Sequence, residues 1–180
     1  MVQRFVASVL VTVGLLAWAQ LRLPNRHVGR WLAFEDGTTS RVYRETVRRG
    51  KATARPVLLV IRFQLRFLGT RPRPHALFRA ESIANTPLFA GFPGFRSKLW
   101  LTDERTGVYR GVYEWDGAEQ ATTYATTLTA LLRVISLPGS VAFRVVPDVR
   151  RDEALRDPTV LEGVDEAPAD RWWRPRVGAA

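Results

Sequence analysis

The sequence contains no cysteine and only two histidines, His27 and His75. The lack of cysteine excludes disulfide bonds, thiolate metal sites and a cysteine nucleophile. The two histidines are far apart in the sequence, which argues against a histidine-rich metal site but leaves open a site built only from carboxylates. Any chemistry must therefore rely mainly on other side chains.

Lysine is also scarce, because Lys51 and Lys98 are the only two and arginine carries almost all of the net charge of +10. Such a surplus favours anionic partners such as nucleic acid, anionic lipid or an acidic small molecule. The arginines are scattered rather than gathered in a block, so a solvated surface explains them equally well. With 180 residues, 46% of them hydrophobic, the chain can form one domain with its own core plus appendages.

One long hydrophobic run, residues 5–21, has about the minimum length for a membrane-spanning helix. Arg4 before it and the small-x-small triplet at 17–19 would suit a cleaved secretory signal. Arginines follow at positions 22, 26 and 30. Such a basic flank tends to stay in the cytoplasm, which favours an uncleaved anchor with a cytoplasmic main domain. A buried or interfacial helix is the third interpretation.

The rest of the chain divides into three regions. Strand-like runs on both sides of Asp36-Gly37 predict a β-hairpin, because Asp-Gly readily forms a two-residue turn. We expect the hydrophobic anchor helix and its basic flank at 1–27, the hairpin and a basic linker at 28–55, the main domain at 56–148 and an irregular tail at 149–180. In the tail, Trp172 and Trp173 suit a membrane anchor, a partner-docking patch or, the interpretation we favour, a clamp on the protein's own surface.

The main domain is expected to follow the order strand, helix, strand, strand, helix, strand. The strands are predicted at 57–67, 95–101, 108–115 and 141–147, and the helices at 75–86 and after a capping box at 116–119. This order is the split βαβ pattern of the ferredoxin-like α+β fold, in which an antiparallel sheet carries two helices on one face.

Alternation along the strands predicts that one sheet face, directed away from the helices, collects polar side chains. The set comprises Arg62, Gln64, Arg66, Lys98, Trp100 and Arg144. Such a face is compatible with open solvent or a subunit interface. The tryptophan among the charges favours an amphiphilic pocket.

Three motifs resemble the YdhR-type monooxygenase family of the dimeric α/β-barrel superfamily. They are Ala-Glu-Ser-Ile at 80–83, Pro-Gly-Phe-x-x-Lys-x-Trp at 93–100 and Gly-Val-Tyr-x-Trp at 111–115, followed by Ala121 and Tyr124. The resemblance covers 57–147 and implies a homodimer whose sheets close on each other. It also implies a pocket between the sheet and the helices or at the mouth of the barrel, for a small aromatic or anionic ligand. Members of the superfamily either oxidise polycyclic aromatic substrates without metal or flavin or bind small ligands without known chemistry, so no cofactor is expected.

The resemblance also implies a set of site residues. Lys98, Glu81 and Tyr113 are the catalytic candidates, with Lys98 holding an oxyanion and Glu81 or Tyr124 acting as base. The ligand-binding candidates are Phe63, Arg62, Arg66, Trp100, Trp115, Tyr124 and Arg144. Aromatic members of this set, with Tyr113, would form a cage around the ligand.

Two other functions compete with the oxygenase interpretation. RNA-binding RRM domains share the strand order, and Arg110-Gly111-Val112-Tyr113 faintly echoes one of their motifs. The first strand lacks the exposed aromatic residue that would stack on a base, so nucleic acid is not an expected partner. The second competitor is a non-catalytic, membrane-tethered module that binds a ligand or plays a structural role, with residues 5–21 as its membrane contact.

Overall fold

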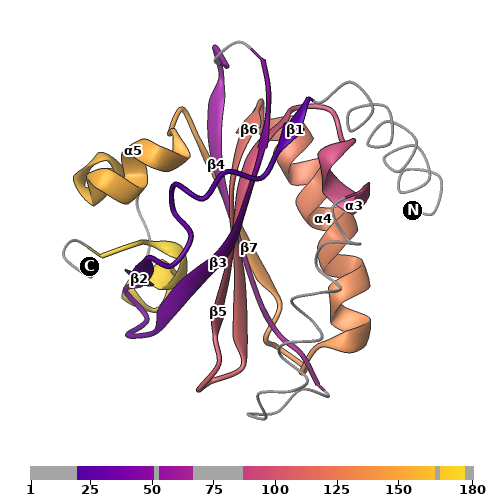
Figure 1. Ribbon diagram of the computed structural model, residues 1–180. Helices are drawn as coiled ribbons and strands as arrows, with labels where there is room; N and C mark the ends of the chain where they lie inside the picture. The colour runs from indigo at the N-terminus through magenta and orange to yellow at the C-terminus, as the bar shows by residue number, and fades with distance from the viewer. Residues whose placement is uncertain (1–19, 51–52, 67–86, 165–166, 177–180) are drawn as a thin grey trace.

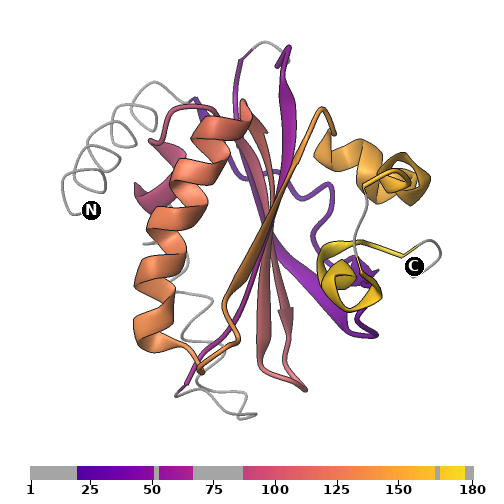
Figure 2. The ribbon, with the colours of Figure 1, turned by 180° about the vertical axis from the view of Figure 1, so that it is seen from behind.

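The computed structural model describes residues 20–50, 53–66, 87–164 and 167–176. A single sheet stands between helices α3 and α4 on one side and the C-terminal helices on the other (Figure 1), and the reverse view shows α4 lying along the sheet (Figure 2). The hydrophobic segment up to residue 19 and the predicted helix at 75–86, which includes Glu81, lie outside the described residues.

The sheet has the strand order β1-β3-β5-β6-β4-β7, and β2 also pairs with β3. The strands are β1 (Leu21–Arg22), β2 (Trp31–Ala33), β3 (Thr39–Arg48), β4 (Pro56–Gln64), β5 (Phe95–Asp103), β6 (Val108–Asp116) and β7 (Ala142–Pro147). The helices are α3 (Pro87–Ala90), α4 (Ala118–Ile135) and α5 (Arg151–Arg156), followed by the 3₁₀ helices η1 (Pro158–Leu161) and η2 (Pro168–Trp173).

The four strands β5-β6-β4-β7, with α4 connecting β6 to β7, have the ferredoxin-like arrangement, so the predicted α+β fold class is confirmed. The expected hairpin is also present, and Gly37 at its turn adopts a φ of 79°. Its long strand β3 pairs with β5 and thereby covers what would otherwise be an exposed edge of the sheet. The end of the expected anchor region does not continue as a helix, because Leu21 and Arg22 pair with β3 instead.

Strand β4 lies in the interior of the sheet, between β6 and β7, and it is apolar on both faces, since Val57 to Ile61 are all buried. Helix α4 packs on the sheet through the predicted stripe, which includes Ala121, Tyr124 and Leu132. The predicted capping box is wrong. The helix begins after Gly117 without a side-chain cap, because the Asp116 carboxylate already accepts hydrogen bonds from Thr53 and Arg96.

The predicted facing of the polar residues is wrong for Lys98 and Trp100. Strand β5 contains a register shift between Phe95 and Ser97, and such a bulge reverses the alternation beyond it. Consequently Trp100 packs in the same cluster as Phe95 on the side of α4, while Leu99 belongs to the cluster on the opposite face. Lys98 lies beside Trp100 and therefore also faces α4.

The opposite face of the sheet is covered by the chain's own C-terminal segment. Trp173 is fully buried in a cluster with sheet residues such as Leu58 and Val112 and with Leu161 of η1. The tail is therefore not irregular, and the interpretation of its tryptophans as a clamp holds for Trp173. The expected homodimer is not shown in this single chain, and the face that would make its sheet-to-sheet contact is already occupied.

A buried ion network fastens this C-terminal segment to the sheet. The Glu45 carboxylate on β3 accepts hydrogen bonds from Arg151 Nη2 of α5 at 2.8 Å and from His27 Nδ1 at 3.1 Å. Glu45 and Arg151 are both almost fully buried, so neither charge can be left without the other at low cost.

None of the helices in the described part of the chain combines the length and apolarity needed to cross a bilayer.

Replacing Trp173 by alanine should lower the free energy of unfolding by about 3–5 kcal/mol, because the substitution empties a large, fully buried site. Trp172 is the matched control, since it packs only partly buried at the edge of the same cluster. Urea denaturation of Trp173→Ala and Trp172→Ala should show the larger loss for Trp173. Equal losses would mean that the segment does not clamp the sheet through Trp173.

Candidate ligand pocket

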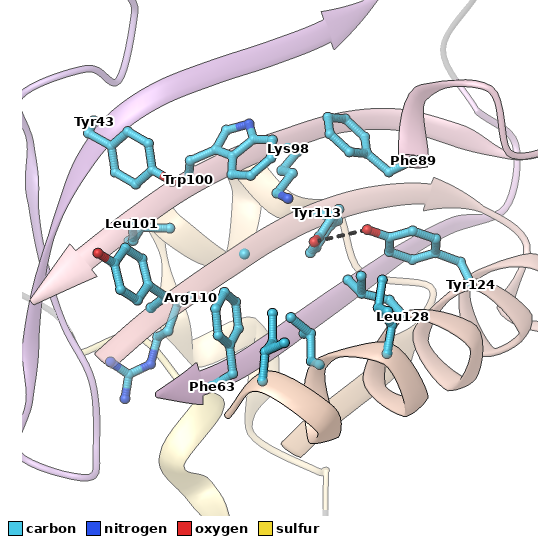
Figure 3. A pocket seen from close by; sticks show the side chains of 15 residues that line it. Tyr43, Phe63, Phe89, Lys98, Trp100, Leu101, Arg110, Tyr113, Tyr124 and Leu128 are labelled. Carbon is cyan, nitrogen blue, oxygen red and sulfur yellow. Dashed lines mark hydrogen bonds between the residues drawn. The ribbon is translucent and has the colours of Figure 1, made fainter. Parts of the chain in front are cut away.

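A cavity of about 180 Å³ lies between the sheet and α4 (Figure 3). Its walls are aromatic rings from the strands and α3, and aliphatic side chains from α4. The described lining side chains include Tyr43, Phe63, Phe89, Lys98, Trp100, Tyr109, Tyr113, Tyr124, Leu128, Leu131, Leu132 and Ile135. Leu131 and Ile135 are also partly exposed at the end of α4, so the opening of the cavity has an apolar rim.

Lys98 is the cationic side chain that lies inside this cavity, with only 5% of its surface exposed. Its Nζ is 3.1 Å from the ring centroid of Trp100, 4.6 Å from that of Phe89 and 4.8 Å from that of Tyr113. Figure 3 shows the amine among these rings. Among the described residues, no carboxylate forms an ion pair with it. Lys98 thus differs from most buried lysines, which are paired with an acid.

Two opposing effects act on the charge of Lys98. Burial lowers its pKa well below the usual 10.5, and the nearby positive charge of Arg44 lowers the pKa further. The aromatic faces favour the ammonium form, by about 2 kcal/mol for a desolvated cation–π contact. Removing an ion from water costs several kcal/mol, so desolvation prevails. The structure thus favours an amine that loses its proton far more readily than an exposed lysine.

Two further features fix the rings around the amine. The indole Nε1 of Trp100 donates a hydrogen bond to Thr46 Oγ1 at 3.2 Å, and the Phe89 ring packs edge-on against Trp100 at 5.3 Å. A second register shift, between Val42 and Arg44 in β3, accompanies the placement of Tyr43 against Trp100. The hairpin strand therefore supplies part of the pocket wall.

Tyr113 and Tyr124 form a buried hydroxyl pair at the inner end of the cavity, with 3.2 Å between their oxygens. Burial raises the pKa of both phenols, so both hydroxyls stay protonated at neutral pH. The Tyr113 ring lies across Gly111, where an added Cβ would come within 2.5 Å of the ring. Gly111 is thus required for the position of Tyr113.

The structure brings together five of the predicted site residues and separates the others. The five that line the cavity are Phe63, Lys98, Trp100, Tyr113 and Tyr124. Trp115 is fully buried in the adjacent core, where its ring packs against Tyr124 at 4.8 Å. Glu81 lies outside the described residues.

The three predicted arginines do not reach the cavity. Arg62 pairs with Asp36 and lies over the Trp172 ring on the opposite face. Arg144 lies over Trp173 on that same face, and Arg66 donates to the Ser136 carbonyl. They were assigned to the site together with Lys98 because the alternation was carried through the β5 bulge. Arg110 contributes to the cavity wall, but its guanidinium is directed away from the cavity and bonds to Ser40 and Asp36.

Several lining residues were missed by sequence reasoning. Tyr43 belongs to the hairpin, which lies outside the region of family resemblance, and Phe89 precedes the motif at 93–100. Tyr109, which stacks on Phe63 at 5.6 Å, could have been found because it faces Phe63 across β4 and β6. Among the described residues, no group of three or more histidine or acidic side chains is arranged to hold a metal ion.

Lys98→Met should stabilise the protein at neutral pH, and the gain should shrink as the pH rises toward 10.5. Below pH 10.5 the lysine is protonated in the unfolded chain, whereas burial disfavours protonation of Lys98 in the folded protein. The free energy of unfolding of the wild type therefore falls as the pH is lowered, by up to about 1.4 kcal/mol per pH unit, until the pH reaches the pKa of Lys98 in the folded protein. Urea denaturation at several pH values from 7 to 10.5 measures this. Arg133→Gln, on the exposed side of α4, is the control. A gain that does not vary with pH would show that Lys98 titrates normally.

Gly111→Ala should displace the Tyr113 ring and cost about 1–3 kcal/mol of unfolding free energy, because the new methyl group overfills a packed site. Near-ultraviolet circular dichroism should report the altered tyrosine environment. The double variant Gly111→Ala, Tyr113→Leu should recover part of the loss, since the clash is with the ring. No recovery would mean that backbone strain, rather than the ring contact, causes the effect.

No family model matches the sequence, and neither does any curated protein. Several solved structures are similar in fold. A ferredoxin-fold protein from Listeria monocytogenes related to antibiotic biosynthesis monooxygenases is 12% identical, with a TM-score of 0.42, covering 69% of this chain and 89% of its own. A monooxygenase-like protein from Listeria innocua is 14% identical, with a TM-score of 0.43, and the match covers 76% of this chain and 85% of the Listeria innocua chain. A heme-degrading enzyme from L. monocytogenes is 12% identical, with a TM-score of 0.44, and the match covers 69% of this chain and 95% of the enzyme. These likenesses concern the fold alone, and the ferredoxin-like assignment rests on the strand order and connections of this chain.

Proposed function

We propose that the protein binds a small aromatic molecule with a weakly acidic hydroxyl in the cavity between the sheet and α4, and that it oxidises this ligand with O₂ without a cofactor. The observation that carries the proposal is the amine of Lys98 enclosed by three aromatic rings in an otherwise apolar cavity. The rings offer stacking surfaces for a planar ligand, and the amine is the group that can exchange a proton with it.

The size of the cavity limits the ligand to about one ring. A cavity of about 150 Å³ is enough for benzene, and the present one is about 180 Å³. Heme, the substrate named for one of the similar structures, is far larger than this volume. His27 is engaged with Glu45 on the opposite side of the sheet, and His75 lies outside the described residues. The described residues thus suit a phenol rather than a porphyrin.

The chemistry follows from where charge develops. A neutral phenol can enter past the apolar rim and then transfer its proton to the Lys98 amine, which yields a phenolate held by an ammonium. The positive charge of Arg44, which disfavours the ammonium in the empty cavity, favours the phenolate. Preorganised positive charge in an apolar site stabilises such an anion more strongly than water does. Lys98 is therefore proposed as the base as well as the oxyanion partner, without a role for Glu81.

An electron-rich phenolate can pass an electron to O₂, and recombination at the carbon para to the oxygen forms a C–O bond. Loss of water then gives a quinone, so that one phenol and one O₂ yield one quinone and one water. The ligand supplies all of the electrons, so the balance needs no external reductant. Tyr113 and Tyr124 keep their protons and would orient the ligand by hydrogen bonding.

A non-catalytic binding module is the second candidate. It is favoured by the lining of the cavity, in which no aspartate, glutamate or histidine is found among the described residues. Binding and oxidation are therefore tested separately.

Resorcinol, a single-ring phenol with a free para carbon, is the probe. Calorimetric titration should show binding to the wild type and at least tenfold weaker binding to Lys98→Met, because a hydrogen bond to a charged group contributes about 1.5–3 kcal/mol. Arg133→Gln, which removes a positive charge outside the cavity, should bind as the wild type does. No binding by the wild type would refute the proposal.

Oxygen consumption with resorcinol then separates the two functions. An oxygenase should consume O₂ and release hydroxyquinone and water in the wild type, with the rate lost in Lys98→Met. Binding without O₂ consumption above the protein-free rate would leave the non-catalytic module as the function.

A further inference from the structure

We propose that Lys98 is a carbonyl-reactive amine, which captures single-ring aromatic aldehydes as an imine inside the cavity. The inference rests on the proposed binding of small aromatic molecules, and it adds a covalent function and a second ligand class to the same site. Three observations on the described residues carry it: the enclosure of the amine by aromatic rings, the positive charge of Arg44 beside it and the largely apolar cavity in front of it.

The first observation is that the enclosed amine of Lys98 does not stabilise the fold. Its Nζ lies within 5 Å of three ring centroids, and among the described residues it makes no ion pair with an acid. A methionine of similar length would fill the same space without the cost of burying an amine. Stability alone therefore disfavours lysine at this position, and what the position gains from lysine is a nucleophilic nitrogen.

The surrounding charges keep that nitrogen reactive. Arg44 on β3 lies over the Trp100 ring at 5.3 Å, on the ring against which the Lys98 amine also packs. The other ionisable residues that line the cavity are Arg110 of β6, whose guanidinium is bonded to Asp36, and four tyrosines: Tyr43 from β3, Tyr109 and Tyr113 from β6, and Tyr124 from α4. Burial and the positive charge of Arg44 act in the same direction, so the unprotonated amine is favoured. An unprotonated lysine in an apolar pocket is the form that attacks a carbonyl.

The reaction balances without an added reagent. The nitrogen lone pair attacks the aldehyde carbon and forms a C–N bond, the carbonyl oxygen takes up a proton to give a carbinolamine, and loss of water leaves the imine. One amine and one aldehyde therefore yield one imine and one water, with no change of oxidation state. The apolar walls disfavour the return of that water, and the three ring faces stabilise a protonated imine by cation–π contacts.

The sequence makes the test unusually sharp, because Lys51 and Lys98 are the only lysines. The full-length protein is incubated at pH 7 with benzaldehyde and sodium cyanoborohydride, which reduces an imine to a stable benzylamine. Peptide mass mapping then locates the benzyl groups. In the Lys51→Arg variant we expect the peptide that contains Lys98 to carry one benzyl group, and to react faster than the lysines of an unfolded reference peptide at the same pH.

The outcomes separate this inference from the proposed function. Benzylation of the α-amino group and Lys51 alone, in protein that still binds resorcinol, would refute imine formation and leave ligand binding intact. If the wild type does not bind resorcinol and Lys98 stays unmodified, both the proposed function and imine formation would be refuted. Resorcinol added as a competitor should slow benzylation of Lys98, because the two ligands share the cavity, and unchanged labelling of Lys98 would mean that resorcinol binds elsewhere and would refute the proposed phenol site. Lys98→Met should show no benzylated internal peptide other than that of Lys51.

Discussion

The constraint on which this structure depends is a central strand that is apolar on both faces. Val57 to Ile61 of β4 are all buried, so neither side of the sheet can face water without a large loss of hydrophobic stabilisation. Helix α4 covers one side and the C-terminal segment with Trp173 covers the other. A ferredoxin-like sheet with one open face would have to find a partner for it, whereas this chain provides the second cover itself. The cavity lined by Lys98 lies on the side of α4.

Buried charges are compensated differently on the two sides of the sheet. Between the sheet and the C-terminal cover, Glu45 and Arg151 neutralise each other at 2.8 Å, and His27 adds a further contact. Between the sheet and α4, Lys98 is surrounded by aromatic faces and lies near the like charge of Arg44. The first arrangement holds two segments together, and the second leaves a buried amine without a compensating acid among the described residues and with a pKa well below its usual value. This contrast is the physical reason to place chemistry at Lys98 rather than in the larger ion network.

The sequence was sufficient for the topology and insufficient for the faces. The order of the described strands and the place of α4 between β6 and β7 could be predicted because periodicity, the Asp36-Gly37 turn and the stripe on α4 are local signals. The grouping of Lys98 with Arg62 and Arg144 failed because one bulge between Phe95 and Ser97 reverses the alternation, and no residue type marks that extra position. Lys98 and Trp100 still line the cavity together, because two residues that are two apart on a strand stay on the same face whichever face that is. The coverage of the second face by η2 depends on tertiary contacts of Trp173, which no local pattern encodes.

The shape of the cavity then determines which ligands can reach the amine. Gly111 on β6 pairs with Trp100 on β5, and the absence of a side chain at Gly111 leaves room for the Tyr113 ring to lie across it. The exposed Leu131 and Ile135 form an apolar rim, so a ligand that passes them must lose hydration water there. A permanently charged ligand would pay the full desolvation cost there, while a neutral phenol or aldehyde would not. Both proposed reactions respect this order, because each begins with two neutral partners and develops charge only after the ligand has been enclosed.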